Sequence, residues 1–307
     1  MYFRRSSGNT HHSSAMQSRL IKSVLTLCAR LPLPVLHGLG VFLGWTLFLI
    51  QGHPRKIAET NITLCYPKLS AQQQRKLVRV CMAETGKTLF ETGALWLRPG
   101  EHTLNLIKHV NGRELVEQAM ANGKGVILAT PHLGAWEAAG LYCASTFNIT
   151  CLYRPPRRAD LEQLVNTARS RLGGHYIAAT SRGVRTLYKT LKHGNAVAML
   201  PDQEPQTGAG IFAPFFGVPA YTMVLLARLA ARSGAPIIFV WCERLSWGRG
   251  YQLHFRTMPN VSKPTDIHAA VNATNKAIED CIRECPAQYQ WSYRRFRTRP
   301  AGEDPFY

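Results

Sequence analysis

From residue 108 onward the sequence alternates short apolar runs with amphipathic stretches, and this alternation is the feature that most constrains the fold. The apolar runs predict strands at 125 to 130, 149 to 153, 195 to 200, 236 to 242 and 251 to 256. The amphipathic stretches predict helices at 112 to 122, 134 to 146, 158 to 172, 182 to 193, 220 to 233 and 265 to 284. Strands separated by helices of this length indicate an α/β fold, with a central, mostly parallel sheet flanked by helices.

A histidine and a glutamate, His132 and Glu137, follow the first of these predicted strands. A histidine can take a proton near neutral pH, and a carboxylate that holds its ring fixes the tautomer and stabilises the imidazolium. Residues five apart lie about 140° apart around an ideal helix, so we expect His132 in the turn and Glu137 on the helix that follows. Exposed amides near Gly134, at the start of that helix, would favour developing negative charge. Taken alone, a histidine near a strand end is more often structural than catalytic.

Further charged residues follow other predicted strands. Arg154 ends the strand 149 to 153, and Asp202 follows the strand 195 to 200. Arg169 and Arg171 lie late on the helix between these strands. Each residue alone suits a solvated surface or a turn. Parallel sheets bind ligands at the carboxyl ends of their strands, so we expect these groups to converge with His132 and Glu137.

The chain is strongly basic. Its 37 Lys and Arg residues against 18 Asp and Glu residues give a formal net charge of +19, which indicates an anionic partner. Nucleic acid, acidic phospholipid, a phosphorylated glycolipid and an acidic carrier protein would each satisfy this charge. The tail from Tyr289 to Arg299 mixes aromatic residues with Arg294, Arg295, Arg297 and Arg299, which suits either phosphates and bases or an anionic membrane interface.

The N-terminal part of the chain predicts contact with a membrane. Residues 1–18 are polar and are expected to be disordered. Residues 31 to 50 carry no formal charge and reach the minimum length for crossing a bilayer core, although prolines weaken that reading and a location in the interface stays open. We therefore expect a disordered N-terminus at 1–18, a membrane-anchoring segment at 19–52 and an α/β domain at 53–307. Residues 55 to 97 read as helical, with a break before a capping serine, Ser70.

The cysteines indicate neither disulfides nor a metal site. Eight are scattered along the chain, and the closely spaced Cys281 and Cys285 lack a second ligand pair. A covalent mechanism through Cys143 or Cys151 is an alternative, but neither has an activating neighbour in the sequence. A lipase or thioesterase is disfavoured because the sequence contains no Gly-x-Ser-x-Gly motif.

An ordered series of motifs resembles the bacterial lipid A biosynthesis acyltransferase family, the late acyltransferases, over roughly residues 20 to 297. After the apolar segment these motifs are Arg55-Lys56-Ile57-Ala58-Glu59-Thr60-Asn61-Ile62, Cys65-Tyr66-Pro67-Lys68-Leu69-Ser70, Thr130-Pro131-His132 with Glu137 (HX4E), Tyr153-Arg154-Pro155, Arg169-Ser170-Arg171, Pro201-Asp202-Gln203, Phe212-Ala213-Pro214-Phe215-Phe216-Gly217-Val218-Pro219-Ala220 and Gln290-Trp291-Ser292-Tyr293-Arg294-Arg295-Phe296. Each motif is weak by itself, whereas their combination and order are specific.

The resemblance implies a glycerolipid-acyltransferase-like fold with an N-terminal membrane-associated helical region. It implies His132 as the general base, Glu137 as the residue that orients it, and Arg154, Arg169 and Asp202 as substrate-binding or site-organising positions. The implied donor is an acyl carrier protein thioester, and the implied acceptor is the hydroxyl of a 3-hydroxyacyl chain on a Kdo-linked lipid A precursor. No metal, organic cofactor or nucleic acid is expected.

The implied location is the bacterial inner membrane, with the catalytic domain on the cytoplasmic side against an anionic membrane surface. Two alternatives remain open. One is an acyltransferase for another glycolipid, such as a phosphatidylinositol mannoside. The other is a non-catalytic module that binds membranes or polyanions.

Overall fold

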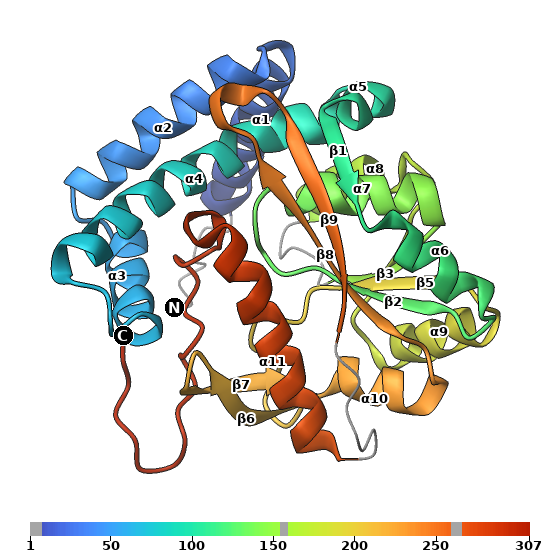
Figure 1. The fold of residues 1–307 in the computed structure, drawn as a ribbon. Helices are drawn as coiled ribbons and strands as arrows, with labels where there is room; N and C mark the ends of the chain where they lie inside the picture. Colours follow the sequence, from blue (N-terminus) through green and yellow to red (C-terminus); the bar gives the residue numbers. More distant parts are fainter. Residues whose placement is uncertain (1–7, 154–158, 259–265) are drawn as a thin grey trace, which may run out of the picture.

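A seven-stranded sheet forms the centre of the molecule (Figure 1). The computed structural model describes residues 8–153, 159–258 and 266–307, so the predicted site residue Arg154 lies outside the described residues. The strands lie in the order β1-β9-β8-β2-β5-β3-β4. Their bounds are β1 (Ile107–Asn111), β2 (Val126–Ala129), β3 (Thr150–Tyr153), β4 (His175–Ala178), β5 (Ala196–Met199), β8 (Ile237–Arg244) and β9 (Tyr251–Thr257). Every neighbouring pair is parallel except β8 and β9, which confirms the predicted mostly parallel sheet.

Helices cover both faces of this sheet. They are α6 (Arg113–Ala121), α7 (Trp136–Phe147), α8 (Ala159–Ser170), α9 (Ser181–Lys192), α10 (Leu225–Ser233) and α11 (Ile267–Glu284). Because successive side chains of a strand point to opposite faces, β2 contributes to two cores. Ile127 and Ala129 pack in the cluster that contains residues of α9, α10 and α11, whereas Val126 and Leu128 pack with residues of α6 and α7. All four residues of β2 are buried, as expected for a central strand.

Four strands differ from the sequence-based expectation. The strands β1 and β4 were not predicted, and they form the two edges of the sheet, where short strands with polar side chains are common. The predicted helix 220 to 233 is wrong at its start. Val218–Met223 forms β7, which pairs antiparallel with β6 (Gly210–Phe215), and α10 begins only at Leu225.

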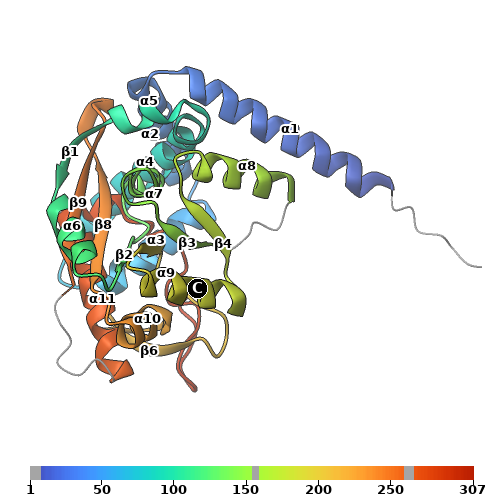
Figure 2. The same cartoon turned by 90° about the vertical axis from the view of Figure 1, so that its right-hand side faces the viewer.

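The N-terminal third is helical and lies over the left and top of the molecule in Figure 1, where it contributes residues to both cores (Figures 1 and 2). Its helices are α1 (Gly8–Arg30), α2 (Leu33–Leu49), α3 (His53–Cys65), α4 (Ala71–Leu97) and α5 (Gly100–Asn105). Ser70 caps α4 as predicted, because its hydroxyl accepts from Gln73 N while the Gln73 side chain accepts from Ser70 N. The start of α1 differs from the expected disorder of residues 1–18, since the helix begins at Gly8.

Helix α2 packs closely on α4 and presents an apolar face outward. A Cβ atom on Gly86 would lie 2.0 Å from Gly40 O, so glycine is required for this close approach. On the outer face Phe42, Trp45 and Leu49 are 72%, 53% and 74% exposed. Within the described ranges, no single helix is both long and apolar enough to cross a bilayer. Helices α2 and α3 together have the length and composition of a membrane span, but they are bent by 82° relative to each other.

A buried polar network joins α2, α4 and the sheet. His37 Nε2 lies 3.0 Å from Glu91 Oε2, and Arg244 Nε donates to both oxygens of Glu91 at 3.0 Å. Tyr251 Oη donates to Glu91 Oε2 at 3.1 Å, and Arg244 Nη2 donates to Gly134 O at 3.0 Å. Burial raises the pKa of Glu91, but Arg244 and His37 outweigh it and lower the pKa to about 2. The network therefore links α2 to the turn that carries His132.

Candidate active site

The turn between β2 and α7 places His132 at the carboxyl edge of the sheet. Its backbone is held on several sides, since Gly134 N donates to Gln288 O at 3.0 Å and Ala135 N donates to Cys242 O at 2.7 Å. Gly134 has a φ of +60°, and a Cβ atom there would lie 2.0 Å from Cys242 O, so this position requires glycine. The predicted strand, turn and helix are thus confirmed. The amide of Gly134, however, is not available to an oxyanion as the sequence suggested, because Gln288 accepts its hydrogen.

Asp202 holds the His132 ring. His132 Nδ1 lies 2.8 Å from Asp202 Oδ1, and His132 N donates to Asp202 Oδ2 at 2.7 Å. Asp202 is fully buried. Burial raises its pKa, but the charge and hydrogen bonds of His132 lower it more, so the pKa of this carboxyl lies below its usual value. An ionised Asp202 fixes the proton of a neutral ring on Nδ1 and leaves Nε2 as the atom that can accept a proton.

Glu137 has different partners from those the sequence suggested. It lies on α7 as predicted, but its carboxylate accepts two hydrogen bonds from Arg169, one of them from Nε at 3.0 Å. Trp96 Nε1 donates to the same carboxylate at 3.0 Å. The predicted contact between Glu137 and the His132 ring is thus corrected: the ring is held by Asp202, which the resemblance had placed among the substrate-binding or site-organising positions. Burial raises the pKa of Glu137, yet Arg169 brings it below its ordinary value.

Arg169, near the end of α8, and Arg171, just after this helix, have separate contacts. Arg169 pairs with Glu137 beside His132, as the predicted convergence requires. Arg171 instead points into the fold, where it donates to the carbonyl oxygens of Leu95 and Trp96. These contacts make Arg171 a link between α8 and the end of α4.

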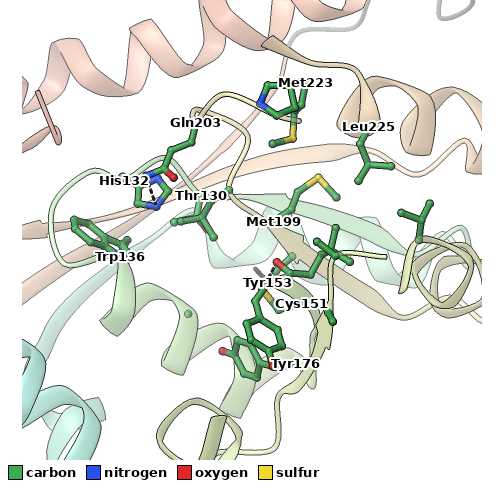
Figure 3. A pocket seen from close by; sticks show the side chains of 18 of the residues that line it. Thr130, His132, Trp136, Cys151, Tyr153, Tyr176, Met199, Gln203, Met223 and Leu225 are labelled. Carbon is green, nitrogen blue, oxygen red and sulfur yellow. Dashed lines mark hydrogen bonds between the residues drawn. The ribbon is translucent and has the colours of Figure 1, made fainter. Parts of the chain in front are cut away.

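Gln203 contacts Nε2 of His132, a relationship that the sequence did not reveal. Its Nε2 lies 3.2 Å from His132 Nε2 (Figure 3). The same nitrogen donates to Gln290 Oε1 at 3.1 Å. Because Asp202 fixes the ring proton on Nδ1, Nε2 of His132 can accept a hydrogen from this amide. The available signal was the position of Gln203, one residue after Asp202 at the end of a predicted strand.

A large, mainly apolar cavity of about 720 Å³ opens beside His132 (Figure 3). Trp136, Met199, Met223 and Leu225 are among the side chains that line it. The volume lies within the usual range for a small-molecule site, roughly 300–1,000 Å³. The apolar walls suit a hydrocarbon chain, and His132 is one of the lining residues.

A second cavity of about 450 Å³ meets the first at His132. Helix α4 lines it with Thr85, Thr88 and Thr92, which share one side of the helix. Its other polar lining residues include Gln288 and Gln290. The residues common to both cavities are His132, Trp136, Glu137, Arg169 and Gln203. His132 thus lies where the mainly apolar cavity joins a second cavity that has several hydroxyl and amide side chains in its lining.

The cysteines offer no competing nucleophile. All eight are free and buried. Cys151 lines the large cavity, but burial raises the pKa of its thiol to about 12. Burial also raises the pKa of Cys143. Because the thiolate is the nucleophile, neither residue is activated at neutral pH. Among the described residues, no cluster of three His, Cys, Asp or Glu side chains could hold a metal ion.

Comparison with known proteins identifies the family. Residues 7–298 match the family described as bacterial lipid A biosynthesis acyltransferase. The chain belongs to this family. Its relatives include the lipid A biosynthesis palmitoleoyltransferase of Escherichia coli, 32% identical over 288 residues and 92% of each chain. The lipid A biosynthesis lauroyltransferase of the same organism is 31% identical over 281 residues, covering 91% of this chain and 90% of the relative.

A more distant relative is a lipid A biosynthesis acyltransferase of Haemophilus influenzae, 28% identical over 251 residues, with 81% of this chain and 78% of the relative covered. The protein is therefore an enzyme, and the class of its reaction is acyl transfer. The resemblance inferred from the ordered motifs is confirmed.

Proposed function

We propose that the protein transfers a fatty acyl chain from an acyl carrier protein thioester to the hydroxyl of a 3-hydroxyacyl chain on a Kdo-linked lipid A precursor. The observation that carries this proposal is the placement of His132, whose ring Asp202 holds through Nδ1 so that Nε2 is left at the junction of the two cavities. The apolar cavity suits the acyl chain, and the junction suits the two reacting groups.

In this mechanism His132 is the general base. Its Nε2 takes the proton of the acceptor hydroxyl while the hydroxyl oxygen attacks the thioester carbonyl carbon. The carbonyl electrons move to oxygen and return as the carbon–sulfur bond breaks, and the leaving sulfur takes the proton from His132. The products are an ester and a free thiol, and positioned base catalysis of this kind is typically worth about 10²–10⁴ in rate.

Glu137 and Arg169 form the charged wall of this site. Their ion pair fixes the Arg169 guanidinium beside both cavities, while the Arg169 side chain remains 26% exposed. A guanidinium in this position can donate further hydrogen bonds to substrate oxygens. We assign Arg169 to substrate binding and Glu137 to positioning Arg169, while Asp202 takes the role of orienting the base.

We further propose that the enzyme works on the cytoplasmic leaflet of the inner membrane. Support comes from the outward apolar side chains of α1 and α2, where Leu20 is 65% and Leu27 59% exposed in addition to the face of α2 described above. Large exposed apolar side chains gathered on neighbouring helices are costly in water and are common at membrane contacts. An enzyme held in this way would meet a lipid acceptor in the membrane plane.

The test is a transfer assay with purified components. The enzyme is incubated with lauroyl-acyl carrier protein and a Kdo-linked lipid A precursor, and the glycolipid is analysed by mass spectrometry. We expect a glycolipid whose mass has increased by one acyl group, formed together with free carrier thiol. Transfer to a precursor that lacks the 3-hydroxyl, or to a phosphatidylinositol mannoside instead, would contradict the proposed acceptor.

A further inference from the structure

Two neighbouring helices, α9 and α10, carry a basic outer surface. On α9 the cations are spaced three, four and three residues apart, so they lie along one side of the helix. All are exposed, and none forms an ion pair with any residue that the structure describes. Helices α9 and α10 also contact each other, as Arg232 lies over the Tyr188 ring at 5.0 Å. The α9–α10 basic surface consists of Arg182, Arg185, Lys189, Lys192, Arg228 and Arg232.

The sequence around this surface is nearly free of acidic residues. Between residues 163 and 242 the only carboxylates are Asp202 and Glu204, and both are buried. Positive charge on α9 and α10 is therefore not balanced by acidic neighbours along this part of the chain. A potential of one sign over a surface attracts a partner of the opposite sign and raises the rate of encounter.

The C-terminal arginines, in contrast, are occupied within the protein. Arg295 is 2% exposed and donates to Tyr221 O and Thr222 Oγ1. Arg297 pairs with Glu204, and Arg294 contacts His53. The sequence-based idea that this tail binds an anionic partner is therefore corrected for Arg295, which stabilises the fold. The cations of α9 and α10, in contrast to these arginines, are exposed and form no ion pair with the residues that the structure describes.

The basic surface borders the large cavity. Thr180 and Val184, at the start of α9, and Leu225, the first residue of α10, line that cavity together with His132. Thr180 is exposed and so is Gln206, another lining residue, which places part of the cavity lining at the protein surface. A partner bound on α9 and α10 would therefore sit next to an opening that leads toward the base.

We propose that the α9–α10 basic surface docks an acidic, soluble carrier protein that brings the acyl thioester to the site. This inference rests on the proposed carrier-dependent function. A membrane is a poorer occupant, because α1 and α2, with their outward apolar side chains, lie in the upper part of both views, whereas α9 and α10 lie in the lower part (Figures 1 and 2). A membrane that covers the first face leaves the second one open to a soluble protein.

The test compares one acyl group on two donors. Lauroyl-acyl carrier protein carries the acidic protein, whereas lauroyl-pantetheine presents the same thioester without it. In the full-length enzyme, Arg182→Glu with Arg185→Glu should raise the Michaelis constant for the carrier-borne donor at least about tenfold. In the wild type this constant should depend steeply on salt concentration, and the variant should lose that dependence. Turnover at saturation and the Michaelis constant for lauroyl-pantetheine should change less than about twofold.

Lys76→Glu with Arg79→Glu is the matched control, because it makes the same change in charge at exposed positions on α4. This control should leave both Michaelis constants near the wild-type values. Equal effects of the α9 substitutions on both donors would overturn the docking proposal, since they would indicate a damaged site. Loss of binding to anionic phospholipid vesicles in the α9 variant would also overturn it in favour of a membrane contact.

The behaviour of the wild-type enzyme distinguishes a wrong donor from a wrong docking surface. If it uses lauroyl-pantetheine but not the carrier-borne donor, the proposed donor is wrong and the docking surface falls with it. If it uses the carrier-borne donor and the α9 variant does so with an unchanged Michaelis constant, only the docking proposal is wrong.

Discussion

Asp202 accepts hydrogen bonds from both the ring and the backbone of His132, with His132 Nδ1 2.8 Å from Oδ1 and His132 N 2.7 Å from Oδ2. This two-point contact fixes the position of the residue and the orientation of its ring together. The parallel pairing of β2 with β5 produces it, because Ala129 and Met199 are register partners near the ends of these strands. Side chains that follow the two strands therefore meet at the same edge of the sheet.

Removing the base should abolish most of the transfer. We expect His132→Ala to lower turnover by at least about 10²-fold, because no other group would take the hydroxyl proton at that point. Turnover is measured on purified protein, with circular dichroism as the check on folding. Near-normal turnover by a folded variant would remove the basis for a general-base role.

Glu137 and Arg169 should behave as a pair. Glu137→Gln leaves the Arg169 charge without its partner. Removing one partner of a buried ion pair lowers the free energy of unfolding by about 3–5 kcal/mol. We expect a smaller loss here, because the Arg169 side chain is 26% exposed and solvent screens its charge. Urea unfolding should show that Glu137→Gln with Arg169→Gln is less destabilised than the sum of the single changes. Strictly additive free energies of unfolding would show that the pair is not coupled.

The Gln203 amide is expected to assist the reaction directly. When the acceptor hydroxyl displaces it from His132 Nε2, an N–H of the amide can turn to the thioester carbonyl oxygen. Gln203→Leu should then lower turnover by about 10²–10³-fold with a small change in the Michaelis constants. Gln206→Leu is the control, since Gln206 lines the same cavity but is exposed. A dithioester donor, whose sulfur accepts hydrogen bonds poorly, should slow the wild type more than the variant, and an equal slowing would argue against this contact.

Acid should weaken the fold through Glu91. Its pKa is lowered from an ordinary value near 4.5 to about 2, so the ionised form stabilises the folded protein above the ordinary pKa. This stabilisation should be lost as the pH falls from about 4.5 towards 2. Urea unfolding across this window should show a smaller pH dependence for Glu91→Gln than for the wild type. Parallel pH profiles for the two proteins would contradict the assignment.

The sequence predicted the site region better than the contacts within it. Regular spacing located β2, β5 and the helix α7, and so placed His132 and Asp202 after strand ends. It could not show that β2 and β5 are neighbours in the sheet, because strand order depends on packing between distant segments. Glu137 was therefore favoured as the partner of His132 by its closeness in sequence, although its carboxylate points to Arg169 and Trp96.

Other differences have similar causes. Gln290 reaches the site from the segment after α11, and no local pattern connects it with Gln203. Arg295 read as a surface cation because its neighbours are basic, yet Thr222 and Asn275 accept its hydrogen bonds in the interior. The edge strands β1 and β4 escaped prediction because their side chains do not form the buried apolar runs that mark central strands.

The most direct test of the account is the turnover of Asp202→Asn, measured with saturating donor and acceptor beside Glu137→Gln. An amide at position 202 keeps the shape but loses the charge that fixes the His132 tautomer and stabilises the imidazolium. We predict that turnover of Asp202→Asn falls by at least about 10²-fold in a protein that remains folded. Wild-type turnover in Asp202→Asn, together with a loss of that size in Glu137→Gln, would contradict the account and return the orienting role to Glu137.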